Sequence, residues 1–236
     1  INIFVHLQLN FNKDNNYNYI NILSTIKKRH IMIIIGITGS IGMGKSTIAS
    51  MFKFFDIPIH DSDLVVKLLI ETNSLVLKKI KKNWPEVIDI IDSKELINKG
   101  KLSEIIFNDT KCKEKLEKII HPLVNKKRKM FLKKYEAKKN IVGMDVPLLY
   151  ETGLNKICNY IFLALTSEAN QAKRVLKRKN MTMEKFISIK ENQWSDEMKK
   201  EQKPYIINTS YGKILVFILL TFLLSIIFFK EKVLKT

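Results

Sequence analysis

Short apolar runs alternate with longer helical patterns along the middle of the chain. Each run has the length of a strand and is rich in β-branched or aromatic residues, which predicts strands buried on both faces. The predicted strands are residues 32–38, 57–60, 141–146, 160–165 and 205–207. Helical patterns lie between them, at 45–55, 111–135 and 168–179. This order predicts an α/β fold whose mainly parallel five-stranded sheet has helices on both faces.

A different pattern occupies residues 214–229, which read ILVFILLTFLLSIIFF and contain no charged residue. Only Thr221 and Ser225 interrupt the apolar residues, so the polar side of an ordinary surface helix is missing. A helix of this length spans about 24 Å, at the short limit for crossing a bilayer, and residues 211–213 extend it. The sequence therefore favours a transmembrane anchor over residues 213–236, with a buried last helix of the globular fold as the alternative.

The first 31 residues differ from the rest in composition. They are rich in Asn and Tyr, contain a single acid at Asp14, and end in the basic stretch KKRH. We interpret residues 1–31 as a disordered N-terminal extension, or as sequence upstream of a true start at Met32. An organelle-targeting segment is the alternative, because such segments are basic and poor in acids. Residues 32–212 are then the globular domain.

Composition narrows the class of protein only slightly. The chain has 236 residues, of which 46% are hydrophobic, enough for one well-packed domain with appendages. The net charge of +18 is compatible with nucleic acid, anionic ligands or a membrane surface, but a genome biased towards Lys and Asn codons produces the same excess. Residues 126–139 lack the interleaved aromatic side chains of a nucleic-acid-binding surface. The two cysteines, Cys112 and Cys158, have no metal-binding spacing and indicate a reducing compartment such as the cytoplasm.

The strongest motif is GITGSIGMGKST at residues 36–47. Gly39, Gly44, Lys45 and Ser46 fit the G-x-x-x-x-G-K-[ST] pattern, with a predicted strand before it and a helix after it. In such a loop the backbone amides point at nucleotide phosphates. Lys45 then balances phosphate charge, and the Ser46 hydroxyl binds Mg²⁺. The predicted nucleotide-binding residues are Gly39, Ser40, Ile41, Gly42, Met43, Gly44, Lys45, Ser46 and Thr47.

A phosphate loop alone does not identify the acceptor. Two acids, Asp61 and Asp63, follow the second predicted strand, at the edge of a parallel sheet where ligands bind. Either carboxylate could orient a substrate hydroxyl, accept its proton or hold Mg²⁺ through water. The structural alternative is that Ser62 or Asp63 caps the helix predicted at residues 64–70.

Several further motifs, in order, resemble the dephospho-coenzyme A kinase family between residues 32 and 208. ITGSIGMGKST resembles the family's phosphate loop, and HDSD resembles its D-A-D element. The stretches at residues 117–124 (EKIIHPLV), 145–154 (DVPLLYETGL) and 171–178 (QAKRVLKR) resemble its H-P, D-V-P-L-L-F-E and Q-x-x-R-x-x-x-R elements. Gln193 stands where the family carries another Gln. Five matches in the same order make a chance resemblance improbable.

The resemblance implies MgATP-dependent phosphorylation of the ribose 3'-hydroxyl of dephospho-CoA, on a P-loop kinase fold with helical acceptor-binding and lid segments. Lys45 and Arg174 would supply catalytic cations, Asp63 would orient the hydroxyl, and Arg178 would contact the nucleotide. From composition alone, both arginines could equally lie on a solvated basic face. The resemblance adds Asp61, His121, Pro147 and Leu148 as acceptor-binding residues. Glu151, beside them, is interpreted as structural.

Departures from the family pattern keep other functions open. Lys67 and Lys99 stand where the family usually has Arg, and Lys203-Pro204 replaces Ala-Asp. Lysine keeps the charge but loses the planar fork that grips phosphate with two hydrogen bonds. The alternatives are another nucleoside or nucleoside-monophosphate kinase, which shares the loop and lid, and a basic, non-catalytic nucleotide-binding protein.

Overall fold

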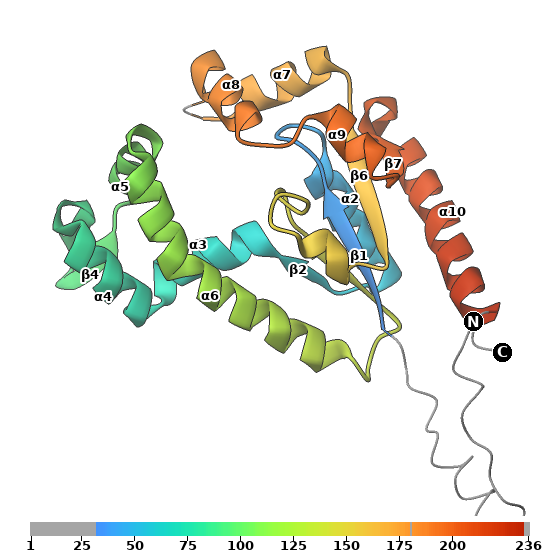
Figure 1. Ribbon diagram of the computed structural model, residues 1–236, viewed down its shortest axis with the longest axis horizontal. Helices are drawn as coiled ribbons and strands as arrows, with labels where there is room; N and C mark the ends of the chain where they lie inside the picture. Colours follow the sequence, from blue (N-terminus) through green and yellow to red (C-terminus); the bar gives the residue numbers. More distant parts are fainter. Residues whose placement is uncertain (1–31, 180, 234–236) are drawn as a thin grey trace, which may run out of the picture. The chain divides into compact units, whose positions relative to one another are not determined.

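The computed structural model describes residues 32–179 and 181–233, so the predicted extension at 1–31 lies outside the described residues. At its centre is a five-stranded sheet in the order β2-β5-β1-β6-β7, and every neighbouring pair is parallel (Figure 1). The strands are β1 (Ile33–Thr38), β2 (Ile59–Asp61), β5 (Ile141–Asp145), β6 (Tyr160–Leu165) and β7 (Tyr205–Asn208). Because all five match the apolar runs in the sequence, the predicted α/β fold is confirmed.

Helices cover both faces of the sheet. The α-helices of the described residues are α2 (Lys45–Phe52), α3 (Ser62–Thr72), α4 (Ser74–Asn83), α5 (Lys99–Asn108), α6 (Thr110–Tyr135), α7 (Glu168–Leu176), α8 (Met183–Glu191), α9 (Asp196–Glu201) and α10 (Gly212–Val233). Of these, α2 and α10 lie on one face of the sheet and α6 on the other. Alternate residues of β1 point to opposite faces, as in any strand. Ile33, Ile35 and Ile37 pack with side chains of α2 and α10, whereas Ile34 packs on the side of α6 with Leu132.

A second apolar cluster joins α3, α4, α5 and α6 to a small hairpin of β3 (Ile88–Ile91) and β4 (Lys94–Ile97). The sequence analysis did not predict this hairpin. Its turn residues, Asp92 and Ser93, have φ angles of 49° and 60°, a left-handed conformation for which Gly or Asn is the usual signal. The hairpin packs beside α3 and α4, and α5 follows it directly, so this layer fixes the helices that line one side of the cleft described below.

The last helix, α10, packs along the same face of the sheet as α2 (Figure 1). Val216, Leu220, Leu224 and Ile227 are buried in the central cluster, which stabilises the fold by on the order of 10 kcal/mol. The globular domain was predicted to end at residue 212, yet α10 belongs to the same compact unit as the rest of the described chain. By length and composition, residues Thr209–Val233 are also apolar enough to cross a membrane.

Candidate active site

The loop between β1 and α2 has the shape that the sequence motif predicts. Gly42 and Gly44 have φ angles of 80° and 95°, which residues with a side chain resist. A Cβ atom on Gly42 would lie 2.5 Å from Val175 Cγ2, and one on Gly44 would lie 2.6 Å from Thr209 Oγ1. Both positions therefore need glycine for conformation and for space. The loop leads directly into the N-terminus of α2, where unpaired backbone amides favour an anion.

Lys45, the lysine of the motif, forms an ion pair with Asp145 at the end of β5. The two side chains are only 13% and 4% exposed. Burial raises the pKa of Asp145, and the attraction of Lys45 partly opposes that rise. The sequence analysis gave Asp145 no role, although the residue opens the D-V-P element. In the free protein it holds the cation that the motif assigns to phosphate.

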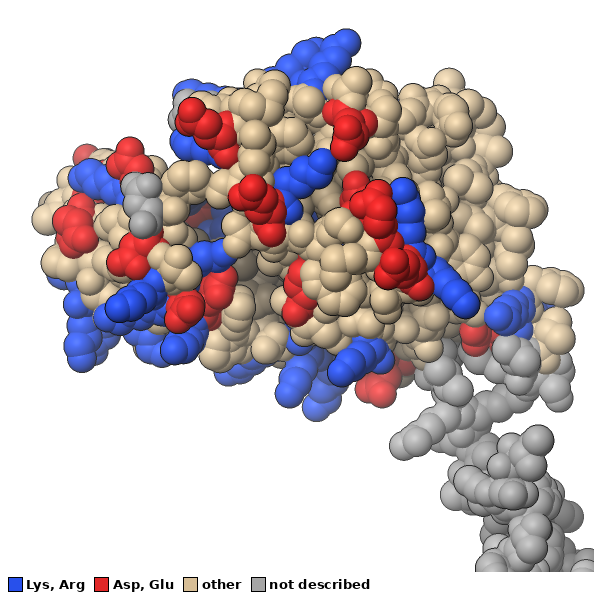
Figure 2. Space-filling model, turned by 45° about the horizontal axis from the view of Figure 1, so that its top comes forward, with Lys and Arg blue, Asp and Glu red and all other residues tan. Residues whose placement is uncertain are grey.

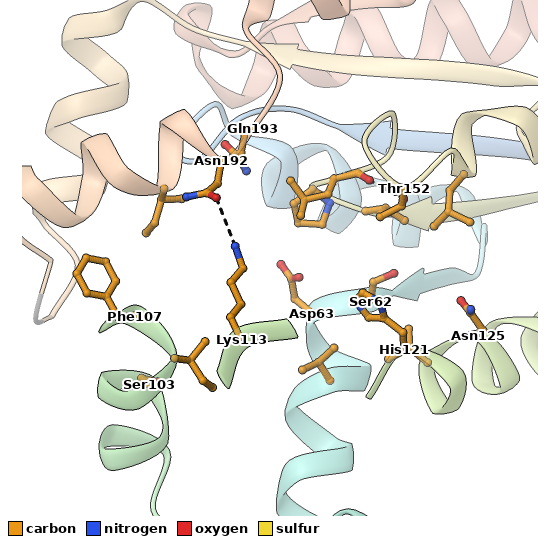
Figure 3. Close-up of a pocket in the computed structure, with 18 of the residues that line it drawn as sticks. Ser62, Asp63, Ser103, Phe107, Lys113, His121, Asn125, Thr152, Asn192 and Gln193 are labelled. Atoms are coloured by element: carbon orange, nitrogen blue, oxygen red, sulfur yellow. Dashed lines mark hydrogen bonds between the residues drawn. The ribbon is translucent and has the colours of Figure 1, made fainter. Parts of the chain in front are cut away.

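The two candidate acids have different positions. Asp61 lies beside Asp145 in the β2–β5 register and is the N-cap of α3, where its side chain accepts a hydrogen bond of 2.9 Å from Leu64 N–H. The prediction that Ser62 or Asp63 caps this helix is therefore wrong, because the helix begins two residues earlier than expected. Asp63 lies in the first turn and faces the cleft (Figure 3). Surrounding protein atoms raise the pKa of its carboxyl, mainly by reducing hydration, while Lys45 opposes the shift.

A cleft of about 1080 Å³ opens in front of Asp63 (Figure 3). It is lined by α3, α5 and α6 on one side and by the segments after β5 and α8 on the other. Three of the four residues predicted to bind the acceptor line this cleft, namely His121, Pro147 and Leu148, whereas Asp61 does not. The helix α6 continues through Pro122, so His121 does not mark a helix boundary.

The charge of the cleft wall is mainly positive. Among the described lining residues Asp63 is the only acid, whereas Lys113 and Arg128 carry positive charge. Lys113 Nζ donates a 3.4 Å hydrogen bond across the cleft to Asn192 Oδ1 (Figure 3). Apolar side chains such as Phe107 and Val124 make up much of the remaining wall. Such a site suits an acceptor that carries both anionic and apolar groups.

Of the two predicted lid arginines, only Arg174 contacts the phosphate loop. Its guanidinium donates hydrogen bonds to Thr209 Oγ1 at 2.8 Å and to Thr209 O at 2.9 Å, and reaches Gly42 O at 3.4 Å. Thr209 Oγ1 in turn donates to Met43 O at 2.7 Å. The sequence predicted a helix over residues 168–179, but α7 ends at Leu176, so Arg178 lies beyond it and is exposed, and the two arginines do not share a helical face.

Residues of the C-terminal half hold the phosphate loop from outside. Gln193 Oε1 accepts a 3.0 Å hydrogen bond from Ile41 N–H, and Gln171 Nε2 donates one of 2.7 Å to Ile41 O. The fully buried Lys199 donates a 2.8 Å hydrogen bond to Ser40 Oγ. Neither Lys199 nor Thr209 was singled out in the sequence analysis, and no local motif marks Lys199.

Lys199 lies among acids that balance its charge. Its Nζ is 3.9 Å from Glu151 Oε1, and Asp196 accepts a 2.7 Å hydrogen bond from Ser40 Oγ. Burial lowers the pKa of Lys199, and both carboxylates oppose that shift. Glu151 also accepts a 2.7 Å hydrogen bond from Trp194 N–H. Its contacts with Lys199 and Trp194 agree with the structural role predicted for Glu151.

Replacing Lys199 by methionine is expected to destabilise the protein by about 3 kcal/mol, since it removes one partner of a buried charged network. The same change should raise KM for the nucleotide that the phosphate loop is predicted to bind, because Ser40 loses an anchor at the edge of that loop. Thermal unfolding and steady-state kinetics measure the two effects. Lys200→Met is the matched control, because Lys200 is 44% exposed and its 3.8 Å pair with Glu197 lies at the surface. Equal behaviour of the two variants would contradict this role.

The residues that depart from the family pattern lie outside the wall of the cleft. Lys67 is exposed, and Lys99 pairs with Glu71 at the start of α5. Lys203 has a φ of 54° in the turn before β7. None of the three is among the residues that line the cleft.

Comparisons with known proteins agree with this site. The sequence profile of the family described as dephospho-CoA kinase matches residues 33–213. A dephospho-CoA kinase of Bartonella quintana is 38% identical over 179 residues, which cover 75% of this chain and 89% of that protein. One of Rhodopseudomonas palustris is 35% identical over 182 residues, 77% of this chain and 88% of that protein.

Solved structures show the same fold. A protein of Thermus thermophilus superposes with a TM-score of 0.68 at 24% identity and covers 83% of this chain and 97% of its own. A dephospho-CoA kinase from Campylobacter jejuni gives a TM-score of 0.58 at 18% identity, covering 81% of this chain and 95% of its own. Profile, relatives and fold all cover the segment that carries the loop and the cleft, and the chain belongs to the dephospho-CoA kinase family.

Proposed function

We propose that the protein transfers the γ-phosphoryl group of ATP to the ribose 3'-hydroxyl of dephospho-CoA, giving CoA and ADP in the final step of CoA biosynthesis. One observation carries this proposal: Asp63 faces a large cleft, also lined by the cations Lys113 and Arg128, at the same sheet edge as Lys45 and its glycine-rich loop. Donor phosphate and acceptor hydroxyl can therefore meet beside one carboxylate.

On the donor side, the amides of residues 39–47 would hold the phosphates of ATP, and Lys45 would leave Asp145 to neutralise them. Arg174 is placed against the same loop and would add positive charge when the segment of α7 and α8 closes. Arg178, which is exposed in the free protein, would contact the nucleotide only in that closed state.

On the acceptor side, Asp63 would orient the 3'-hydroxyl and accept its proton as the phosphoryl group transfers. His121, Pro147 and Leu148 line the cleft in which the adenosine would lie. Lys113 and Arg128 would face the acceptor's phosphates. Asp61 would act indirectly, by fixing the first turn of α3 through its hydrogen bond to Leu64 N–H.

The oxygen atoms near the loop fit a magnesium ion. Ser46 is exposed, the charge of Asp61 contributes to the raised pKa of Asp63, and the charges of Asp61 and Asp63 contribute to the raised pKa of Asp145, so the three carboxylates lie close together. Among the described residues no cluster of three or more His, Cys, Asp or Glu side chains could hold a metal alone. Mg²⁺ is commonly bound through few protein oxygens together with substrate phosphates. When bound, it would neutralise charge on the transferring phosphate, with Ser46 as its protein ligand.

We place the reaction in the cytoplasm. The chain has two cysteines, Cys112 and Cys158, without metal-binding spacing, and such thiols suit a reducing compartment. Burial raises the pKa of Cys158 to about 12, so this thiol stays protonated and unreactive at neutral pH.

A substrate panel tests the proposed function. The purified full-length chain is incubated with γ-labelled ATP and Mg²⁺ in the presence of dephospho-CoA, AMP, dTMP or shikimate. We expect label to appear in CoA and in none of the other products. Lys45→Ala protein serves as the control for contaminating kinases. Transfer to a nucleoside monophosphate without transfer to dephospho-CoA would overturn the substrate assignment.

A further inference from the structure

The outer face of α10, formed by Ile214, Ile218, Phe222, Ile226 and Phe229, is unusually apolar for a surface. Ile214, Phe222 and Phe229 are 78%, 62% and 69% exposed. The most apolar 18-residue stretch within Thr209–Val233 has a mean hydropathy of 2.6, and only 22% of that stretch is buried. A terminal helix that faced only water would carry polar residues on this side.

The apolar surface extends beyond α10 to the short helix η1 (Lys53–Phe55). Phe54 is 78% exposed, and its ring meets the ring of Phe217 edge-on at 5.8 Å between centroids. Phe55 stacks on the ring of Phe217, at 5.2 Å between centroids. In Figure 2 the charged side chains gather on the part of the molecule away from α10, and the side formed by α10 is largely tan. Two separate elements thus build one apolar surface.

Polar groups within this surface have their hydrogen bonds satisfied inside the helix. Thr221 Oγ1 donates a 2.9 Å hydrogen bond to Phe217 O, and Ser225 Oγ donates one of 2.8 Å to Thr221 O. Such internal bonds let a hydroxyl enter an apolar medium without an unpaired donor. The only hydroxyl side chains between Ile214 and Phe229 are therefore compatible with contact with lipid chains.

The charges at the ends of α10 favour an anionic partner. Lys213, Lys230 and Lys232 are all exposed. The one acid of the helix, Glu231, instead accepts a 2.8 Å hydrogen bond from the Tyr160 hydroxyl. Lysines that flank an apolar helix face suit the headgroups of an anionic bilayer. A second copy meeting this face in antiparallel fashion would bring Lys213 of one chain close to Lys230 and Lys232 of the other, which repels it.

The opposite side of α10 argues against a free transmembrane helix. Val216, Leu220, Leu224 and Ile227 are in the core with strand residues such as Phe162. Release of α10 into a bilayer would expose that core to water. Contact with lipid through the outer face requires no such release.

We propose that the outer face of α10, together with Phe54, is an interfacial binding surface for an anionic lipid bilayer. The helix lies in the plane of the membrane surface while its inner side stays packed on the kinase domain. An interfacial helix replaces the transmembrane anchor that the sequence favoured. The proposal does not depend on which acceptor the enzyme phosphorylates.

Flotation of the full-length chain with vesicles tests this proposal. One set of vesicles is phosphatidylcholine alone, and the other contains about 30 mol% phosphatidylserine. We expect binding to the anionic vesicles that weakens in high salt, and a loss of about tenfold or more in Ile218→Glu/Phe222→Glu protein. The matched control is Leu75→Glu/Ile90→Glu, whose side chains are 62% and 73% exposed on other elements. Circular dichroism and phosphoryl transfer in the absence of vesicles show that each variant is folded.

Several results would overturn the proposal. Failure of the full-length chain to float with anionic vesicles would do so, as would equal binding by the two double variants. Binding that resists extraction with alkaline carbonate would show a spanning helix instead. A dimer in analytical ultracentrifugation that Ile218→Glu/Phe222→Glu dissociates, without vesicle binding, would identify a second copy as the occupant of this face.

Discussion

Replacing Lys45 by alanine is expected to lower kcat/KM for ATP by about 10²- to 10³-fold, the effect of removing one preorganised charge from a phosphoryl-transfer site. The variant loses the cation of the loop, and it also leaves the buried carboxylate of Asp145 without its partner. Steady-state kinetics measure the first loss. Thermal unfolding measures the second, because an unpaired buried charge destabilises the fold.

A double variant separates these two effects. Lys45→Ala/Asp145→Asn removes the unpaired charge, so it should recover thermal stability without recovering activity. Lys53→Ala, an exposed lysine just after α2, controls for a general loss of positive charge. If Lys45→Ala kept kcat/KM close to that of the unmodified enzyme, the loop would not serve ATP in the way we propose.

Replacing Asp63 by asparagine is expected to slow turnover by about 10²- to 10⁴-fold, the contribution of a general base, while ATP affinity is largely kept. The side chain faces the cleft, and amide nitrogen cannot accept a proton from the acceptor hydroxyl. Neighbouring protein atoms reduce the hydration of Asp63 and raise its pKa, so loss of activity on acidification should begin above the ordinary range of an aspartate. Turnover and its pH dependence, together with ATP binding by calorimetry, check this expectation.

Asp61→Asn is the matched control for Asp63→Asn. Asparagine caps a helix as well as aspartate does, so the bond to Leu64 N–H should survive and α3 should begin at the same residue. We expect a much smaller loss of turnover in this variant. The opposite ranking, with Asp61→Asn inactive and Asp63→Asn active, would move the role of base to Asp61.

Local patterns in the sequence were sufficient to predict the strands of the sheet and the phosphate loop. The strands are short runs of β-branched residues buried on both faces, and such runs can be recognised in a sequence without knowing which strands they pair with. Gly42, Gly44 and Lys45 lie within one loop between a strand and a helix, so their geometry follows from adjacent residues. The β3–β4 hairpin was missed because its Asp92-Ser93 turn lacks the usual glycine or asparagine.

Contacts between distant residues could not be predicted in the same way. Lys45 and Asp145 are 100 residues apart, and Lys199 and Ser40 are 159 residues apart. Nothing near Lys199 in the sequence distinguishes it from the chain's many surface lysines, and its contacts are with the distant residues Ser40 and Glu151. The two sides of α10 are equally apolar, so the sequence could not show that Leu220 enters the core while Phe222 remains outside.

The helices α3, α5 and α6, which line the acceptor cleft, lie on the other side of the central sheet from α10 (Figure 1). None of the residues that line the cleft belongs to α10, to η1 or to the edge strand β7 beside α10. If the enzyme bound a membrane through α10, the opening of its acceptor cleft would face the aqueous phase. Water-soluble nucleotides could then enter and leave without crossing the headgroup layer, so docking would change where CoA is made without slowing its release.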